Sequence, residues 1–358
     1  MSPLHVVARA PRWADRWWSV APEIGVYIGA GCVSTAVIAT VASRYRLEAS
    51  RVETLPDGVV VPSPIEPNIR RPDVVIERLK AAVPAVKRRE AAISLPDAAV
   101  RVAILDLARL PARRVEQEAV FRHHLEHLFL NPLGRCRFAF QRLRTADGGK
   151  RERLLVAAIR DEILEEYEAV VRAAGLWPSV VDLSAFHLFN LYEQRIDASL
   201  QSGRPGQSGR RVLFLNLFDR NFTLIVADRN GPALIRIKAF PGTVGDADLI
   251  TRMLAEIDAS LRISDAAFVD EESPIERLFV FSDRPLDELD RRMHEEYRVE
   301  TTRLLSDGRP EAAGEGAVRE GQGGPPPNGA AGSSLGSVHD EERQAVTMAL
   351  AAAVGCRV

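Results

Sequence analysis

The sequence predicts an α/β protein built from two related lobes that face each other across a cleft. Two observations lead to this prediction. A hairpin of two apolar strands, Ile24 to Val41, has a counterpart at Val212 to Ala227. In each copy a third apolar run and then a helix-like segment follow the hairpin. A duplicated unit of three strands and a helix, with further strands and helices after each copy, indicates two α/β lobes of similar design.

The first hairpin joins two strands through a glycine turn. Residues 24–28 alternate between apolar and other side chains, and Gly29-Ala30-Gly31 interrupts the alternation. The run from Val33 to Val41 is apolar, mainly β-branched and too short to span a bilayer, so we expect a central strand covered on both faces. The remaining elements of this copy are a third run, Arg46 to Leu55, and a helix, Pro72 to Ala82.

The second copy repeats the order of elements and not the residue identities. Asn216 lies 189 residues after Tyr27 (216 minus 27), and the two residues hold equivalent places in their hairpins. The elements of this copy are three apolar runs, Val212 to Leu217, Phe222 to Ala227 and Ala233 to Phe240, joined by turns at 218–221 and 228–231 and followed by a helix, Asp246 to Leu261.

Composition places the chain among globular proteins with sizeable cores. It has 358 residues, 46% of them hydrophobic, and a formal charge of -2, which supplies no bulk attraction to nucleic acid or to an anionic membrane. Cys32, Cys136 and Cys356 follow no metal-like or disulfide-like spacing, as expected in a reducing compartment. The sequence shows neither an apolar run long enough to cross a membrane nor a signal-peptide core. We therefore expect a cytoplasmic protein without a nucleic-acid partner.

The N-terminal extension, residues 1–22, is rich in tryptophan. On a helix, Trp13, Trp17 and Trp18 share one side, and Arg12 and Arg16 lie close to them. Such a helix suits one of two roles: packing of its tryptophans on the first lobe, or membrane association through a lipid headgroup region. We favour packing, since large aromatic side chains are mostly buried in globular proteins.

A small inserted α+β subdomain is predicted within the first lobe. Residues 23–88 are assigned to the first part of that lobe, 89–145 to the insert and 146–200 to the rest of the lobe. A compact group of strands and a helix between two parts of a lobe is typical of a subdomain. The predicted elements of the insert are strands Ala91 to Leu95, Val100 to Leu107 and Arg135 to Leu143, and a helix from about Arg113 to Leu130.

The predicted helix of the insert contains His123-His124-Leu125-Glu126-His127, which matches the inverted zincin pattern H-x-x-E-H. In that pattern two imidazoles one helical turn apart, here His123 and His127, hold Zn²⁺, and the carboxylate of Glu126 activates water. The sequence identifies no third ligand. Apolar residues of this helix form an ordinary amphipathic stripe, which leaves the histidines on the wetter side. We therefore favour surface or partner-facing histidines, with a zinc site as the alternative.

The rest of the first lobe has the punctuation of an α/β protein. A strand, Leu154 to Ile159, precedes a helix that stops at Gly175. A second strand, Pro178 to Leu183, precedes a helix for which Ser184 is the predicted N-cap. Residues 201–210, rich in Gly, Pro and Ser, form the predicted linker to the second lobe.

The second lobe is assigned to residues 211–305, and composition changes abruptly after it. A strand, Arg277 to Phe281, and a helix, Pro285 to Glu295, are its last predicted elements. Residues 306–337 contain almost no large apolar side chain, which predicts disorder. Residues 338–358 begin with a capping-box pattern and carry a stripe of small side chains, so we expect a terminal helix that docks closely on a lobe.

Six stretches, taken in their order and spacing, carry a resemblance to a known family. They are Val26 to Gly29, Ala92 to Pro96, Leu154 to Ala158, Ala174 to Leu176, Val181 to Leu183 and Ala345 to Ala353. In these stretches the chain resembles PilM, the actin-like protein of type IV pilus assembly, and more distantly FtsA of the divisome. The resemblance covers nearly everything except the first 20 residues and residues 306–337. It implies a duplicated ribonuclease H-like core of the actin/HSP70 type.

The departures from this family fall in the cleft. Members of the fold hold ATP and Mg²⁺ between two hairpin turns, with an acid in each first strand and glycines beside the phosphates. Tyr27-Ile28-Gly29 and Asn216-Leu217-Phe218 stand where the family has Asp-Ile-Gly. Phe281-Ser282-Asp283-Arg284 stands where the family has a glycine pair near the adenosine. We predict no cofactor, with ATP and Mg²⁺ as the alternative. The remnant of a nucleotide cleft consists of Gly29, Gly31 and Thr223.

The resemblance also implies a function. A PilM-like protein lies at the inner membrane, binds the cytoplasmic tail of a PilN-like membrane protein and links it to the pilus assembly machinery. Because the nucleotide motifs are degenerate, we predict a non-catalytic scaffold, a pseudo-ATPase. The alternatives are an ATPase with an altered nucleotide site and a zinc-dependent hydrolase, and a type II secretion component shares the same fold. We expect the partner tail to bind between the first lobe and the insert, roughly Arg89 to Leu143.

Overall fold

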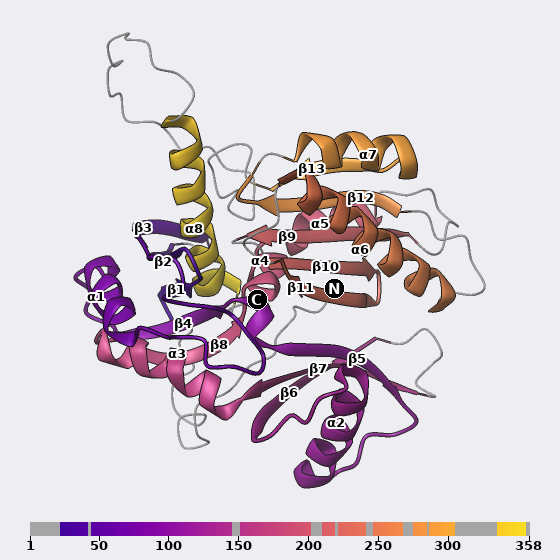
Figure 1. Cartoon of the computed structure of the whole chain (residues 1–358), viewed down its shortest axis with the longest axis horizontal. Helices are drawn as coiled ribbons and strands as arrows, with labels where there is room; N and C mark the ends of the chain where they lie inside the picture. The colour runs from indigo at the N-terminus through magenta and orange to yellow at the C-terminus, as the bar shows by residue number, and fades with distance from the viewer. Residues whose placement is uncertain are drawn as a thin grey trace.

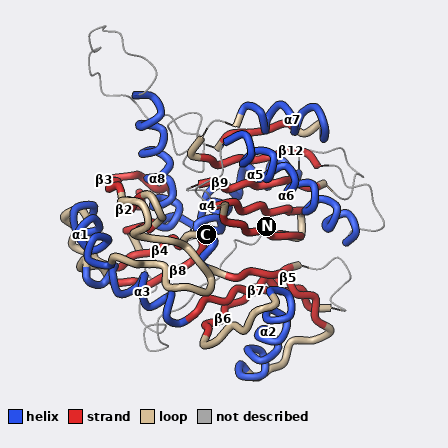
Figure 2. Tube along the Cα trace, in the orientation of Figure 1, coloured by secondary structure: helices blue, strands red, loops and turns tan. Residues whose placement is uncertain are grey.

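The computed structural model describes residues 22–41, 44–144, 151–201, 210–218, 221–240, 246–267, 275–284, 286–304 and 335–355. These residues form two five-stranded sheets and one three-stranded sheet, with helices packed on their faces (Figure 1). The two larger sheets are the cores of two lobes, and the smaller sheet belongs to an inserted subdomain (Figure 2). The predicted two-lobed α/β fold is confirmed.

The first lobe contains strands β1 (Ile24–Ile28), β2 (Cys32–Val41), β3 (Arg44–Thr54), β4 (Glu90–Leu95) and β8 (Trp177–Leu183). Their order in the sheet is β3-β2-β1-β4-β8. The first three strands are antiparallel neighbours, whereas β4 pairs parallel with β1 and β8 pairs parallel with β4. β1 is central and buried over its whole length.

The second lobe repeats this topology strand for strand. Its strands are β9 (Arg211–Phe218), β10 (Asn221–Asp228), β11 (Gly231–Ala239), β12 (Ile275–Ser282) and β13 (Glu300–Arg303), in the order β11-β10-β9-β12-β13. β9 pairs antiparallel with β10 and parallel with β12, as β1 does with β2 and β4. Asn216 opposes Thr223 in the second hairpin, as Tyr27 opposes Ser34 in the first. The duplication inferred from element order is therefore present in the sheets.

Helices cover both faces of the first sheet. α1 (Pro72–Ala82) and α3 (Asp161–Ala173) contact each other, and α4 (Ser184–Leu191) contacts α8 (Leu335–Gly355). Two adjacent residues of β2 show that these pairs lie on opposite faces. Thr35 donates a hydrogen bond of 2.6 Å to the Ala82 carbonyl of α1, and Ser34 donates to the Ala345 carbonyl of α8. Polar side chains inside this buried strand thus bind helix ends or helix backbone.

One face of the second sheet packs on its own helices, and the other packs on the first lobe. α6 (Asp246–Ala267) and α7 (Asp287–Tyr297) share a core with residues such as Leu215 and Leu224. On the opposite face Phe214, Phe218 and Phe281 join the core of the first lobe, as does the short helix α5 (Glu193–Gln201). One continuous hydrophobic core therefore crosses from lobe to lobe.

The inserted subdomain is an antiparallel sheet with one helix. It contains β5 (Arg101–Leu107), β6 (Cys136–Leu143), β7 (Glu152–Arg160) and α2 (Arg114–Phe129), with the strand order β5-β7-β6. We expected β4 in this subdomain and the strand at 154–159 in the first lobe. Instead β4 pairs with β1 and β8, and β7 is the central strand of the insert. Both strands are mostly buried, and burial alone does not reveal which sheet a strand joins.

The C-terminal helix α8 approaches β1 very closely at Gly25. A Cβ built on Gly25 would lie 1.7 Å from the Ala349 carbonyl oxygen and 2.8 Å from the Ala353 nitrogen, so a residue without a Cβ is required there. Gln344 also donates through Nε2 to the Ser282 carbonyl of the second lobe. Among the α8 side chains that the structure describes, the buried ones are Ala345, Thr347, Met348, Ala349, Leu350, Ala351, Ala352, Ala353 and Val354.

Several expectations concern residues that the structure does not describe. The tryptophan-rich segment 1–21, most of the linker, 202–209, and most of the segment expected to be disordered, 306–334, lie outside the described residues. α8 begins at Leu335, so residues 335–337 are helical, contrary to the expected boundary at 338. None of the described helices combines the length and apolarity that a membrane span needs.

Candidate functional site at the interface of the lobes

The turn of the first hairpin is closed by its own backbone. The amide of Gly29 donates a 2.9 Å hydrogen bond to the Cys32 carbonyl, and the amide of Leu55 donates a 2.8 Å bond to the Gly31 carbonyl. Gly29 and Gly31 therefore lie together in the first turn. The Gly29 amide is engaged inside the hairpin, where it does not point outward to a ligand.

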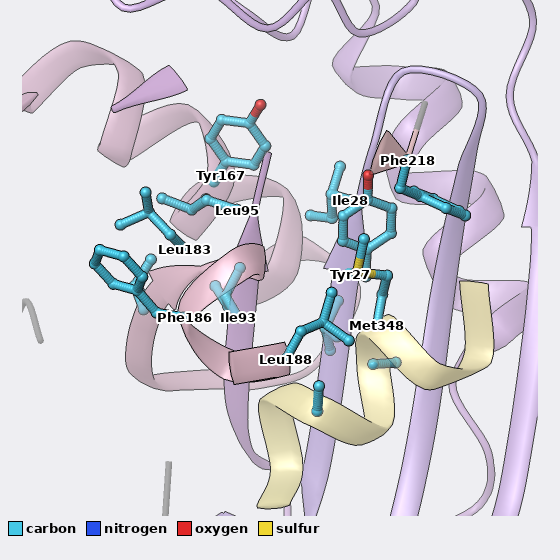
Figure 3. Close-up of a cluster of buried hydrophobic side chains, with 14 of the residues drawn as sticks. Tyr27, Ile28, Ile93, Leu95, Tyr167, Leu183, Phe186, Leu188, Phe218 and Met348 are labelled. Atoms are coloured by element: carbon cyan, nitrogen blue, oxygen red, sulfur yellow. The ribbon is translucent and has the colours of Figure 1, made fainter. Parts of the chain in front are cut away.

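Three aromatic rings meet where the two lobes touch. The rings of Tyr27 and Phe218 lie edge to face, with centroids 5.5 Å apart and an angle of 74° (Figure 3). Phe218 also contacts Phe281, with centroids 6.1 Å apart. All three side chains are at most 5% exposed. We call them the aromatic cluster; it joins the first strand of each lobe to β12.

A buried carboxylate lies at the same interface. Asp97 accepts hydrogen bonds at Oδ1 from Ser184 Oγ and the Ala185 amide, both at 2.9 Å. At Oδ2 it accepts bonds from Asn216 Nδ2 at 3.0 Å and Thr223 Oγ1 at 2.7 Å. The first two donors belong to the first lobe and the last two to the second. We call this group the Asp97 clasp, since one carboxylate binds both lobes.

Local structure explains how Asp97 reaches this place. The chain leaves β4 at Leu95, and Pro96 leads into a single 3-10 turn, η2 (Asp97–Ala99), that is buried between the lobes. The carboxylate lies at the N-terminus of α4, where free backbone amides and the helix dipole favour an anion. Ser184 was the predicted cap of α4, but its hydroxyl makes no capping bond and donates to Asp97 instead. Asp97 caps α4 from a distant part of the chain.

Burial dominates the electrostatics of the clasp. It raises the pKa of Asp97 above the usual value of a carboxyl, and the hydrogen bonds from Ala185, Thr223, Ser184 and Asn216 reduce that rise without cancelling it. Asn216 Oδ1 is also buried, and no described residue donates to it. The donors of the second hairpin are thus committed to a carboxylate of the protein itself.

The structure brings together part of the predicted remnant site and adds what the sequence did not show. Thr223 lies in the interface, where its hydroxyl donates to Asp97. The sequence did not identify Asp97 as an interface residue, because Pro96-Asp97 between two strands has the composition of an ordinary exposed turn. Its full burial depends on the second lobe, whose donors are 119 and 126 residues further along the chain. The available signal was an acid flanked on both sides by strongly apolar segments.

The histidines of α2 do not form a metal centre with other described residues. His123 and His127 are exposed, and Glu126 accepts a 3.0 Å hydrogen bond from the Leu133 amide and lies 3.6 Å from Arg122. No group of three or more His, Cys, Asp or Glu side chains in the described ranges is arranged to hold a metal ion. Through its hydrogen bond with the Leu133 amide, Glu126 holds the loop after α2 in place.

Comparison with known proteins identifies the family. The sequence profile described as type IV pilus assembly protein PilM matches residues 25–255, which is more than half of the chain. This chain belongs to the PilM family. Among solved structures, a PilM-PilN type IV pilus biogenesis complex is 19% identical, with a TM-score of 0.61, and the match covers 79% of this chain and 89% of that one. At this identity the structural likeness shows the fold, and the profile shows the family.

Two more distant structures are similar to this PilM family chain. The cytoplasmic domain of EpsL, a type II secretion component of Vibrio cholerae, is 12% identical with a TM-score of 0.41, covering 74% of this chain and 83% of that one. A Bacteroides thetaiotaomicron protein with an actin-like ATPase fold is 9% identical with a TM-score of 0.44, covering 78% and 89%. A comparison with curated proteins gives no match.

Proposed function

We propose that this PilM family protein is a non-catalytic scaffold of a type IV pilus assembly complex at the inner membrane, where it binds the cytoplasmic tail of a PilN-like protein. The aromatic cluster is the observation that carries the non-catalytic part. Its members, Tyr27, Phe218 and Phe281, are the residues that replace three elements of the family's nucleotide site, and they contact one another. Replacements that pack together fill space and stabilise the interface, which supports a fold kept without its nucleotide.

The charge of the interface supports the same proposal. A nucleotide site needs acids to hold Mg²⁺ and backbone amides to face phosphate oxygens. Neither Tyr27 nor Asn216 can supply the negative charge expected at those positions. The acid that is present, Asp97, accepts hydrogen bonds from four donors of the protein itself. The missing acids and the aromatic cluster therefore both argue against a bound triphosphate.

The first expected result concerns nucleotide. Calorimetry with Mg·ATP at tens of micromolar protein should give no binding signal, and a phosphate-release assay should give no turnover above buffer. Loss of one charged interaction at the Mg²⁺ site costs about 1.5 to 3 kcal/mol, which is about a ten- to hundredfold loss of affinity. Micromolar binding that Gly29→Leu abolishes would restore the ATPase alternative.

The PilN-like partner is proposed from the family and from the printed identity of the PilM-PilN complex. The insert offers a docking element, because β6 has a strand neighbour on one side only in the described sheet. Ala139 and Leu143 of β6 are partly buried and face the core of the first lobe. An extended tail could add to this edge and place apolar side chains against that face.

The second expected result concerns this edge. Ala139→Lys should weaken binding of a PilN-like tail peptide at least about tenfold, since it places a charge where an apolar side chain of the tail would pack. The peptide is the cytoplasmic tail of the PilN-like protein from the same genome, measured by calorimetry. Val115→Lys, on the exposed outer side of α2, serves as the control. Full affinity of the folded Ala139→Lys variant would place the tail elsewhere.

A further inference from the structure

The insert is the basic part of an acidic chain. Residues 100–161 contain 13 Arg and Lys against 7 Asp and Glu, a formal charge of +6 (13 minus 7), whereas the whole chain carries -2 (47 minus 49). The remaining residues therefore carry -8 (-2 minus 6). An uneven distribution of this size directs the insert toward anionic partners.

Several of these arginines gather beside the C-terminal end of α2. Arg101 and Arg160 project from β5 and β7 on the side of the sheet that α2 covers, since Arg101 opposes Ala158 and Ala158 packs in the core under α2. Arg160 opposes Cys136 on β6. Arg122 of α2 completes the group. Burial raises the pKa of the Cys136 thiol, and the positive charges of all three arginines oppose that rise. The cluster therefore surrounds one end of β6.

Arg101 is the least satisfied member of the cluster. Arg122 donates to the Gly134 carbonyl at 2.6 Å, and Arg160 donates to the Ile65 carbonyl at 2.8 Å. Arg101 is 8% exposed and stacks on the Phe129 ring at 4.6 Å, but no described residue forms an ion pair or hydrogen bond with it. Burial and the positive charge of Arg160 both lower its pKa. An unpaired, nearly buried guanidinium beside a second one favours an anion between or above them.

The C-terminal end of α2 exposes two leucines, one on either side of Phe129, whose ring stacks on Arg101. Leu130 is 85% exposed and Leu128 is 57% exposed. Leu130 adopts a left-handed backbone with φ of 52°, a conformation that disfavours a leucine. Because its side chain is exposed, burial within this chain does not offset that strain. The loop after α2 is nevertheless held in place, since Glu126 accepts from the Leu133 amide.

We propose that Arg101, Arg122, Arg160, Leu128 and Leu130 form a binding surface for anionic phospholipid. Guanidinium groups bind the headgroup phosphate through paired N–H donors, and exposed leucines enter the acyl boundary beside it. Charge complementarity favours an anionic lipid over an apolar protein segment as the partner, because the leucines lie beside three arginines. This proposal goes beyond the proposed function. The surface lies on the α2 face of the insert sheet and Ala139 lies on the other face, so lipid binding is tested independently of tail binding.

The test is flotation of the full-length protein with vesicles. The partition coefficient is measured with phosphatidylglycerol–phosphatidylcholine vesicles and with phosphatidylcholine vesicles. The double variant Arg101→Gln/Leu130→Asn should lower binding to the anionic vesicles by about tenfold or more. The matched control Arg114→Gln/Val115→Asn also removes one positive charge and one exposed apolar side chain, but at the opposite end of α2, and should bind as wild type does.

The single variant Leu130→Asn sharpens the test. Asparagine tolerates the left-handed conformation, so its melting temperature should equal or exceed that of the wild type while vesicle binding falls. A merely structural role for Leu130 predicts no fall. Equal binding of the two double variants would overturn the proposal and assign membrane binding to another part of the chain. Stabilisation by inorganic phosphate through Arg101 without any vesicle binding would also overturn it, in favour of a small-anion site.

Discussion

Asp97→Ala is expected to lower the free energy of unfolding by about 3 to 5 kcal/mol, the cost of leaving buried polar groups without a charged partner. The change removes the shared acceptor of Ser184, Ala185, Asn216 and Thr223. For a protein of this size the melting temperature should fall by roughly 10 °C. Chemical denaturation and thermal melts followed by circular dichroism measure both quantities.

The control for this prediction is Asp57→Ala, which removes an exposed carboxylate in a turn of the same lobe and should change stability by less than about 0.5 kcal/mol. The pH dependence adds a second check. Because the pKa of Asp97 is raised in the fold, the stability linked to its protonation is fully present below the unfolded value of about 3.9 and is lost as pH rises through the folded value. The deficit of Asp97→Ala should therefore shrink as pH rises. A deficit that grows with pH would contradict the raised pKa.

Gly25→Ala is expected to destabilise the protein by about 3 kcal/mol, at the upper end of what overpacking a core costs. The new methyl group would overlap the Ala349 carbonyl and come close to the Ala353 nitrogen. Both obstacles are helix backbone, so the strain cannot be relieved by rotating a side chain. α8 must move away from β1, which exposes part of its buried small-residue face. The measurement is the unfolding free energy, with hydrogen exchange of the α8 amides as a local readout.

Gly58→Ala separates this steric effect from the general effect of replacing a glycine. Gly58 has φ of +75°, and an added Cβ would meet nothing within 4 Å. Its replacement should cost only the left-handed conformational penalty, about 1 kcal/mol, and leave α8 exchange unchanged. If Gly25→Ala is no more costly than Gly58→Ala, the close approach of α8 to β1 is not a determinant of stability.

The docking of the two lobes has a structural cause within the chain. Here Tyr27 meets Phe218, and Asp97 binds Asn216 and Thr223, so the chain supplies these contacts itself. Contacts of this kind fit the scaffold proposed above, since no ligand takes part in them.

The sequence by itself determined the duplicated architecture. The hairpin of β1 and β2 and its counterpart in β9 and β10 follow from local signals, namely period-two alternation, apolar runs and turns rich in glycine or in polar residues. Such signals act over a few residues, so they survive in a single chain without any comparison. The same holds for Gly175, which ends α3 with φ of 88°, as its position after the helical pattern predicted.

Tertiary structure alone decided which strands share a sheet and what the interface contains. Periodicity shows that β4 and β7 are buried strands, but pairing energies between segments far apart in the chain set their neighbours. Each of the two strands therefore lies in a different subdomain from the one predicted for it. The replacements at Tyr27, Phe218 and Phe281 were visible one by one, whereas their mutual contact was not. Asp97 finds its donors 87 to 126 residues away, and a hydrogen bond over that separation leaves no trace in local composition. The physical reason is that burial of a charge depends on what folds over it.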